Sequence, residues 1–108
     1  MNGSIDIAPA DLATLHTVLA TWPPAEVQVW VFGSRATGEA RRYSDLDLAP
    51  EGPAPLDSDL LGRLADALSE SGLTIKVDLV DLSRVEPAFR QLIERNMVRL
   101  PRSAEPGR

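Results

Sequence analysis

Residues 27–49, VQVWVFGSRATGEARRYSDLDLA, give the strongest indication of the fold, because they contain two predicted strands separated by a glycine turn. Residues 27–32 are rich in β-branched and aromatic side chains and are apolar on nearly both faces, which predicts a central strand. Residues 45–49 alternate aspartate with leucine, which predicts a strand with one polar face. Gly33 and Ser34 interrupt the first of these runs, so a turn is expected between the strands.

Patterns outside this stretch alternate between helix and strand. Pro9 suits the first turn of a helix, and Pro23 and Pro24 end it. In chain order we expect a helix at 8–22, a short helix or turn at 35–40, a loop at 51–55, a helix at 56–71, a long strand at 73–82, a helix from Ser83 or Glu86 to Asn96 and a short edge strand at 97–100. Together these elements predict an α/β (α+β) fold with a small mixed β-sheet flanked by helices.

Length and composition limit the class of protein. A chain of 108 residues has the size of one domain, so we expect a single domain over 1–108, with an ordered core at about 8–100 and a flexible tail at 101–108. The chain has no cysteine, which excludes disulfides and thiolate metal sites and fits a cytoplasmic protein. Its start carries no secretory signal, and no stretch is long enough to cross a membrane. The net charge is −5 without a basic block, so stable nucleic-acid binding is not expected.

Three aspartates are the candidates for a metal site. Asp45 and Asp47 are two residues apart in a predicted strand, so both carboxylates leave the same face of the sheet. If the strand at 73–82 is a neighbour, Asp78 completes a triad on that face. Two carboxylates about 4 Å apart repel by roughly 4 kcal/mol near a protein surface, and hard divalent cations such as Mg²⁺ offset that repulsion. Two metal ions held in this way can activate an attacking oxygen and stabilise a leaving pyrophosphate.

The same residues also have a purely structural interpretation. A D-x-D pair in a half-exposed strand is usually a solvated face, and Asp78 alone could be an edge-strand charge that discourages aggregation. The turn at Gly33 and Ser34 favours the functional interpretation, because free N–H groups at the start of a helical turn favour a phosphate and the serine hydroxyl can donate to it. Ten residues separate Ser34 from Asp45, and a chance match to the four motif positions is on the order of one in a thousand.

This spacing resembles the nucleotidyltransferase superfamily of DNA polymerase β, whose motif is G-S, a spacer, D-x-D and a later aspartate on a neighbouring strand. More closely, VFGSRATGEARRYSDLDLA (31–49) and KVDLVDLSRVEPAFRQLIERNMVRL (76–100) look like the corresponding stretches of the minimal nucleotidyltransferases, known as MNT proteins. The resemblance covers about residues 25–100. It implies a polymerase β-like fold and the transfer of a nucleotide from a nucleoside triphosphate, with Mg²⁺ as cofactor.

The resemblance implies a role for each residue that matches the motif. Gly33 and Ser34 hold the triphosphate of ATP. Asp45 and Asp47 bind the metal ions, of which two are expected. Asp78 is the third carboxylate, a further metal ligand and the candidate base toward the incoming hydroxyl.

Two basic residues near the motif are each left with two interpretations. Arg35 matches a position that is frequently basic or polar in the family and could contact phosphate, whereas the alternative is a solvated arginine on a helix. Lys76 lies two residues before Asp78 and should share its face. It is either a structural ion-pair partner or a nucleotide contact.

The resemblance also implies a partner. Larger members of the superfamily add an acceptor-binding domain, and this chain has no residues to spare for one, so another protein chain is expected to bring the acceptor. Many MNT proteins are antitoxins of HEPN/MNT pairs, which implies a hetero-oligomer with a HEPN-type ribonuclease toxin and transfer of AMP to a tyrosine of that toxin. Two alternatives stay open: an antitoxin that acts by binding alone, and nucleotidyl transfer to a small molecule such as an aminoglycoside.

Overall fold

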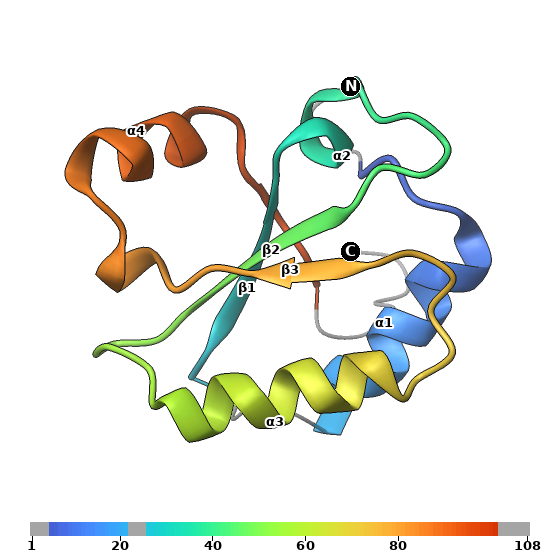
Figure 1. Cartoon of the computed structure of the whole chain (residues 1–108), viewed down its shortest axis with the longest axis horizontal. Coiled ribbons are helices and arrows are strands. Elements are labelled where there is room, and N and C mark those ends of the chain that lie inside the picture. Colours follow the sequence, from blue (N-terminus) through green and yellow to red (C-terminus); the bar gives the residue numbers. More distant parts are fainter. Residues whose placement is uncertain (1–4, 22–25, 102–108) are drawn as a thin grey trace.

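The computed structural model describes residues 5–21 and 26–101. In these ranges helices pack against a four-stranded sheet (Figure 1). No helix in them is long and apolar enough to span a membrane. The elements are, in chain order, α1 (Pro9–Thr21), β1 (Gln28–Phe32), α2 (Ser34–Thr37), β2 (Leu46–Glu51), α3 (Ser58–Ser69), β3 (Val77–Leu79), the 3₁₀ helix η1 (Leu82–Arg84), α4 (Pro87–Asn96) and β4 (Val98–Arg99).

The sheet is mixed, as predicted, with the strand order β3-β2-β1-β4. β1 pairs antiparallel with β2 and with β4, whereas β2 and β3 run parallel. A parallel pair needs a crossover connection, and α3 supplies it between β2 and β3 (Figure 1). The arrangement leaves β3, which carries one of the candidate aspartates, at an edge of the sheet.

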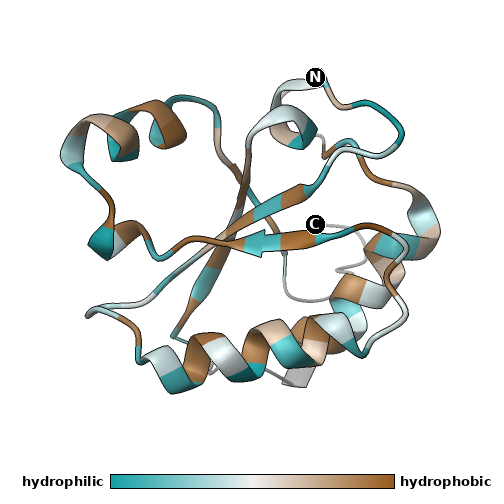
Figure 2. Ribbon diagram, in the orientation of Figure 1, coloured by the Kyte–Doolittle hydropathy of each residue, from teal (hydrophilic) through white to brown (hydrophobic). Residues whose placement is uncertain are grey.

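The main core lies between the sheet and the helices α1 and α3. Because side chains alternate along a strand, Leu46 and Leu48 of β2 both point into this core, and both are fully buried. Figure 2 shows that hydrophobic and hydrophilic residues alternate along α3, as is expected for a helix with one face toward the core. The buried members of the core are Leu15, Leu19, Val29, Val31, Leu46, Leu48, Leu64, Leu68 and Leu100.

A smaller core lies on the opposite face of the sheet, next to α4. Asp47 points to this face, because its neighbours Leu46 and Leu48 point into the main core. The candidate carboxylates therefore lie on the α4 side of the sheet. The buried members of the smaller core are Ala49, Leu82 and Ile93, and Trp30, Phe32, Val80 and Met97 pack against them.

The prediction of a long third strand at 73–82 is wrong, because β3 has only three residues. Before β3, the amide and the hydroxyl of Thr74 donate to the carboxylate of Asp11 at 3.0 and 2.5 Å, instead of joining the sheet. After β3, the carboxylate of Asp81 accepts hydrogen bonds from the amide and the hydroxyl of Ser83 and begins η1. The two aspartates thus limit the strand at its two ends.

The second strand is longer than its alternating pattern predicts. β2 begins one residue after the predicted start at 45 and continues through Glu51, beyond the predicted end at 49. The extension follows from pairing with β1, since Gln28 lies opposite Glu51. The predicted loop at 51–55 therefore begins one residue later.

The bounds of the helices agree more closely with the ranges predicted from the sequence. α3 begins and ends two residues inside the predicted range of 56–71. α4 begins at Pro87 with Glu86 in the N-cap position, which is the later of the two predicted starts. The predicted end of the first helix at 22 and the predicted tail beyond 101 lie outside the described residues.

Asp11 is expected to make stability depend on pH. It is 4 % exposed, and the hydrogen bonds from the hydroxyl and then the amide of Thr74 lower its pKa, as does the charge of Arg35. A carboxyl whose pKa is lowered by folding stabilises the protein above its unfolded pKa and loses this effect as the pH falls through the folded pKa. Asp11→Asn should therefore lower the free energy of unfolding by about 2 kcal/mol at pH 7.

Urea unfolding of Asp11→Asn and of the wild type across a pH series measures this effect. The difference between the two proteins should shrink as the pH is lowered below 3.8, the ordinary pKa of the group. A difference that stays constant from neutral to acid pH would show that the ionised carboxylate of Asp11 is not the stabilising group.

Candidate active site

β1 ends in a turn that requires glycine. Gly33 has φ +75° and ψ −157°, a region of backbone space that residues with a Cβ avoid. α2 follows directly and has four residues, so its dipole is small. A phosphate at this turn would depend mainly on the bare backbone of Gly33 and on the hydroxyl of Ser34.

The same glycine faces one of the candidate carboxylates. A Cβ placed on Gly33 would collide with Oδ2 of Asp47 and lie 3.4 Å from its Cγ. Phe32, the residue before the turn, lies opposite Asp47 in the pairing of β1 with β2. The glycine turn and the D-x-D pair are therefore in contact, although a ten-residue spacer separates them in the sequence.

The structure brings the three predicted carboxylates to one end of the sheet. Asp47 in β2 lies directly opposite Asp78 in the parallel strand β3, so both side chains leave the same face. Asp45 lies one residue before β2 begins. Burial raises the pKa of Asp47, and the charges of Asp78 and then Asp45 raise it further. The three acidic groups are thus within electrostatic reach of one another.

The carboxylates are suitable ligands for a hard divalent cation, which prefers oxygen donors. Among the described residues, no three acidic, histidine or cysteine side chains stand in an arrangement that could already hold a metal ion. Oδ1 of Asp78 instead lies 3.9 Å from Nζ of Lys76, and the two side chains are 46 % and 73 % exposed. An exposed ion pair of this kind contributes little stability, so Asp78 can leave Lys76 for a cation at small cost.

Arg35 is buried, and its guanidinium binds the protein's own backbone. It is 6 % exposed, so the alternative interpretation of a solvated arginine is wrong, whereas the contact with phosphate stays a prediction. Its guanidinium donates to the carbonyl of Ser44 through Nε at 3.1 Å and through Nη2 at 2.9 Å, and to the carbonyl of Asp6 through Nη1 at 2.8 Å. Because these partners are carbonyl groups, no side-chain pattern in the sequence could have indicated them.

A cavity of about 260 Å³ borders the glycine turn. α4 forms its other wall with two apolar side chains that are unusually exposed, Phe89 at 44 % and Leu92 at 58 %. The sequence suggested only a helix at these positions, because an apolar stripe on a helix is typical of a core residue set. The cavity is lined by Phe32, Gly33, Thr37, Phe89, Leu92, Ile93 and Asn96.

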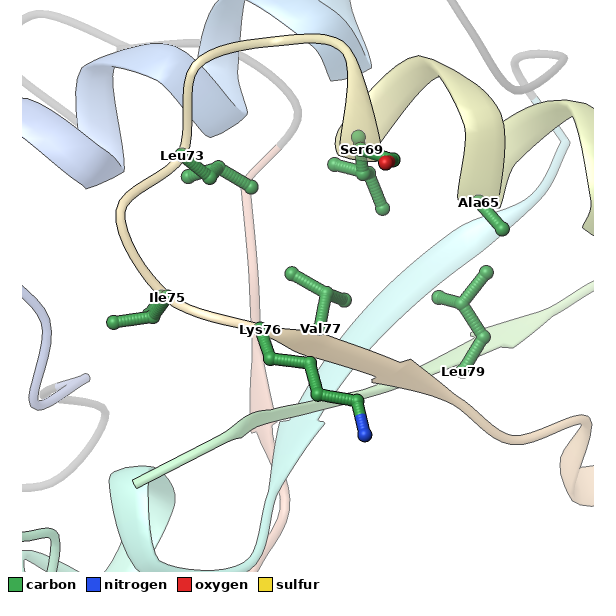
Figure 3. A pocket seen from close by; sticks show the side chains of 8 residues that line it. Ala65, Ser69, Leu73, Ile75, Lys76, Val77 and Leu79 are labelled. Atoms are coloured by element: carbon green, nitrogen blue, oxygen red, sulfur yellow. The ribbon is translucent and has the colours of Figure 1, made fainter. Parts of the chain in front are cut away.

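A second cavity, of about 220 Å³, lies between α3 and β3 on the main-core side of the sheet. Figure 3 shows Val77 and Leu79 pointing toward α3, whereas the side chain of Lys76 extends away from it. Asp78 lies between Val77 and Leu79 in the strand, so it points to the opposite face. This cavity is therefore separate from the carboxylates.

Comparison with known proteins identifies the family. Residues 23–104 match the family described as Polymerase beta, Nucleotidyltransferase, and the chain belongs to this family. A protein of Haemophilus influenzae named "Probable protein adenylyltransferase MntA" is 43 % identical over 91 residues, which span 84 % of this chain and 79 % of that protein. The predicted membership of the polymerase β-like superfamily is thus confirmed.

Solved structures with a similar fold include toxin–antitoxin complexes. A crystal structure of a toxin–antitoxin with AMP-PNP has a chain that matches with a TM-score of 0.67 and 27 % identity, over 87 % of this chain and 74 % of that one. A structure of the tri-AMPylated Shewanella oneidensis HEPN toxin in complex with its MNT antitoxin matches with a TM-score of 0.62 and 25 % identity, over 85 % of this chain and 70 % of the other. These matches confirm the fold that the sequence motif implied.

Proposed function

We propose that this chain is a metal-dependent nucleotidyltransferase and the antitoxin of a HEPN/MNT toxin–antitoxin pair. It transfers AMP from ATP to a tyrosine of the cognate HEPN toxin and so neutralises the toxin. The observation that carries the proposal is the direct pairing of Asp47 with Asp78, with Asp47 in contact with the glycine turn. The likeness to MntA supports the class of reaction, and the likeness to the complexes with AMP-PNP and with an AMPylated HEPN toxin supports the nucleotide and the partner.

Each residue of the site has its own task in this reaction. Gly33 and Ser34 hold the triphosphate, since glycine lets it approach the backbone and the serine hydroxyl can donate to it. Asp45, Asp47 and Asp78 would hold two Mg²⁺ ions. When bound, Mg²⁺ supplies positive charge that neutralises the triphosphate and the departing pyrophosphate and lowers the pKa of the attacking hydroxyl.

Asp78 is the proposed base. The tyrosine oxygen forms a bond to the α-phosphorus of ATP, the bond from that phosphorus to the pyrophosphate oxygen breaks, and the hydroxyl proton passes to the carboxylate of Asp78. Asp78 suits this task because it lies on the edge strand β3 with a side chain that is 46 % exposed, so an acceptor on another chain can reach it. Asp47 lies on an inner strand between β1 and β3, which suits a fixed ligand.

An antitoxin that acts by binding alone explains the site less well. Burial and two neighbouring negative charges destabilise the ionised form of Asp47, which is why its pKa is raised. A protein that only covers its toxin gains nothing from this destabilisation, whereas an enzyme that binds cations does. Transfer to a small molecule is also less well supported, because the similar proteins named above are a protein adenylyltransferase and components of toxin complexes. We place the protein in the cytoplasm, where ATP is available.

Intact-mass spectrometry of the partner toxin tests this proposal. Incubation of the chain with its cognate HEPN toxin, ATP and Mg²⁺ should add one or more AMP groups to the toxin, and peptide mapping should locate them on tyrosine. Omission of ATP or addition of EDTA should prevent the modification. Neutralisation of the toxin at equal molar ratio without any gain in mass would show that binding alone is sufficient. AMP on an aminoglycoside in the absence of the toxin would instead support the small-molecule alternative.

A further inference from the structure

Arg35 is a buried cation next to the loop that joins the two parts of the site. It is the second residue of α2, directly after Gly33 and Ser34, and only 6 % of it is exposed. A buried guanidinium is stabilised only when its N–H groups have hydrogen-bond acceptors. Its acceptors are the backbone carbonyl of Asp6 and those within residues 41–44, at the far end of the ten-residue spacer.

The shortest contacts from Arg35 to the spacer are with Ser44, the residue just before Asp45. Nε and Nη2 donate to one carbonyl oxygen, that of Ser44, at 3.1 and 2.9 Å. Nη2 also lies 3.5 Å from the carbonyl oxygens of Arg41 and Arg42. Asp45 follows Ser44 in the chain, so the guanidinium holds the peptide that leads into the D-x-D pair.

Burial of side chains does not hold this spacer in place. Arg41, Arg42 and Tyr43 are all exposed, Tyr43 at 83 %. The amide of Arg41 donates to the hydroxyl of Ser44, and the amide of Ser44 donates to the carbonyl of Arg41. These bonds close a local turn without attaching it to the rest of the domain. The hydrogen bonds from Arg35 provide that attachment.

The same side chain is anchored at its other end by the segment before α1. Nη1 of Arg35 donates to the carbonyl of Asp6 at 2.8 Å, and the amide of Asp6 donates back to the carbonyl of Arg35 at 2.8 Å. The carboxylate of Asp11, 4 % exposed and bound to Thr74, interacts electrostatically with the guanidinium. Its negative charge helps to offset the burial of the cation. Arg35 therefore has a fixed position from which to hold the spacer.

We propose that Arg35 is a positioning residue, whose guanidinium sets the place of Ser44 and Asp45 relative to Gly33 and Ser34. In this arrangement the carboxylates would hold metal ions beside the triphosphate that Gly33 and Ser34 would bind. This inference rests on the proposed function. Arginine is required, because its planar guanidinium donates two hydrogen bonds to one carbonyl and further bonds to others in a fixed geometry, which a lysine ammonium group cannot do.

Arg35→Lys and Arg35→Gln test this role, with Arg63→Gln as the matched control. Arg63 lies on α3, which packs on the other face of the sheet, and its side chain is 66 % exposed, so this control removes the same charge as Arg35→Gln does, but away from the site. In Arg35→Lys we expect kcat for AMP transfer to fall about 10- to 100-fold, because ångström-scale displacement of reacting groups costs this much, while KM for ATP changes less than about threefold. The Mg²⁺ concentration for half-maximal rate should rise, because Asp45 is displaced.

Hydrogen exchange provides a readout that does not depend on activity. The amides of residues 41–46 should exchange faster in Arg35→Lys than in the wild type, while those of α3 stay protected. Arg35→Gln should show a larger effect of the same kind. If the glutamine variant does not fold, the lysine variant decides the question by the same measurements. Binding of Mn²⁺ to the folded variants, followed by electron paramagnetic resonance, should be weaker than in the wild type.

Three results would overturn the proposal. An unchanged kcat with a raised KM for ATP would show that Arg35 contacts phosphate. Unchanged exchange at 41–46 would show that it does not hold the spacer. Faster exchange throughout the domain with unchanged Mn²⁺ binding would show a role in stability alone. If the wild-type chain transfers no AMP, the proposed function fails, whereas exchange and Mn²⁺ binding still test the positioning role.

Discussion

Asp47→Asn is expected to lower the rate of AMP transfer to the toxin by about a thousandfold. Asp47 is the central carboxylate of the site, because it lies opposite Asp78 and in contact with the glycine turn. Asparagine preserves the shape of the side chain and removes its negative charge. The site would then hold a cation more weakly, and the charge that develops on the leaving pyrophosphate would be left without compensation. Intact-mass measurements over time, at saturating ATP and Mg²⁺, give the rate.

Asp59→Asn is the matched control for this charge removal. Asp59 lies in α3, which packs on the other face of the sheet, and its side chain is 77 % exposed and paired with Arg63. Exposed pairs of this kind contribute little, so the control should transfer AMP at close to the wild-type rate. A wild-type rate in Asp47→Asn, or an equal loss in the control, would contradict the assignment of Asp47.

The loss of activity in Asp47→Asn should come with a gain in stability. Burial and the charges of Asp78 and Asp45 raise the pKa of Asp47 above 3.8, so the ionised group destabilises the folded state at pH 7 when no metal is bound. In EDTA the asparagine variant should therefore unfold at a higher urea concentration than the wild type. Because the carboxyl group takes up its proton in the folded state at a higher pH than in the unfolded state, this advantage should shrink as the pH falls toward 3.8 and be absent at lower pH.

Gly33→Ala is expected to reduce both stability and transfer. A residue with a Cβ at φ +75° lowers the free energy of unfolding by roughly 1–3 kcal/mol. The added methyl group would also collide with Oδ2 of Asp47, so the carboxylate must move. We expect AMP transfer to fall about 100-fold, because a displacement of this size at the reacting groups has an effect of that order. Urea unfolding and the mass-spectrometric rate measure the two effects.

Gly38→Ala separates backbone strain from the collision. Gly38 has φ +84°, and a Cβ placed there meets no atom within 4 Å. Because Gly38 lies in the left-handed helical region at ψ +11°, which is less restricted than the region of Gly33, this variant should lose less stability and keep most of its activity. In an Asp47→Ala background, Gly33→Ala should cost less stability than it does in the wild type, because the colliding carboxylate is gone and only the backbone strain remains. Equal losses of stability and activity in the two single glycine variants would argue against contact between the turn and Asp47.

Alternation along strands made much of the site predictable. Aspartate alternating with leucine at 45–48 predicts one acidic face, and Leu46 and Leu48 are fully buried on the other. A complete triad also required that the strand with Asp78 lies next to the strand with Asp47. The parallel pairing of β2 with β3 fulfils that condition and sets Asp47 directly opposite Asp78. Local patterns thus predicted which residues share a face, and the topology determined which strands meet.

Features that depend on distant hydrogen bonds could not be predicted in this way. β3 is short because the amide of Thr74 donates to Asp11, a residue 63 positions earlier in the chain. Arg35 also bonds to residues far from it in the sequence, since its acceptors are the backbone carbonyls of Asp6 and Ser44. Every residue carries a carbonyl, so the identity of the neighbouring side chains gave no signal for this contact.

Crystals of the chain grown with Mn²⁺ and AMP-PNP would show whether the three aspartates and the glycine turn form one site for metal ions and triphosphate, because anomalous scattering locates the metal ions. Mn²⁺ bound by the three aspartates, with the triphosphate against the hydroxyl of Ser34 and Asp78 turned away from Lys76, is the predicted result. Mn²⁺ bound elsewhere, or a triphosphate outside the glycine turn with Asp78 still paired to Lys76, would contradict it.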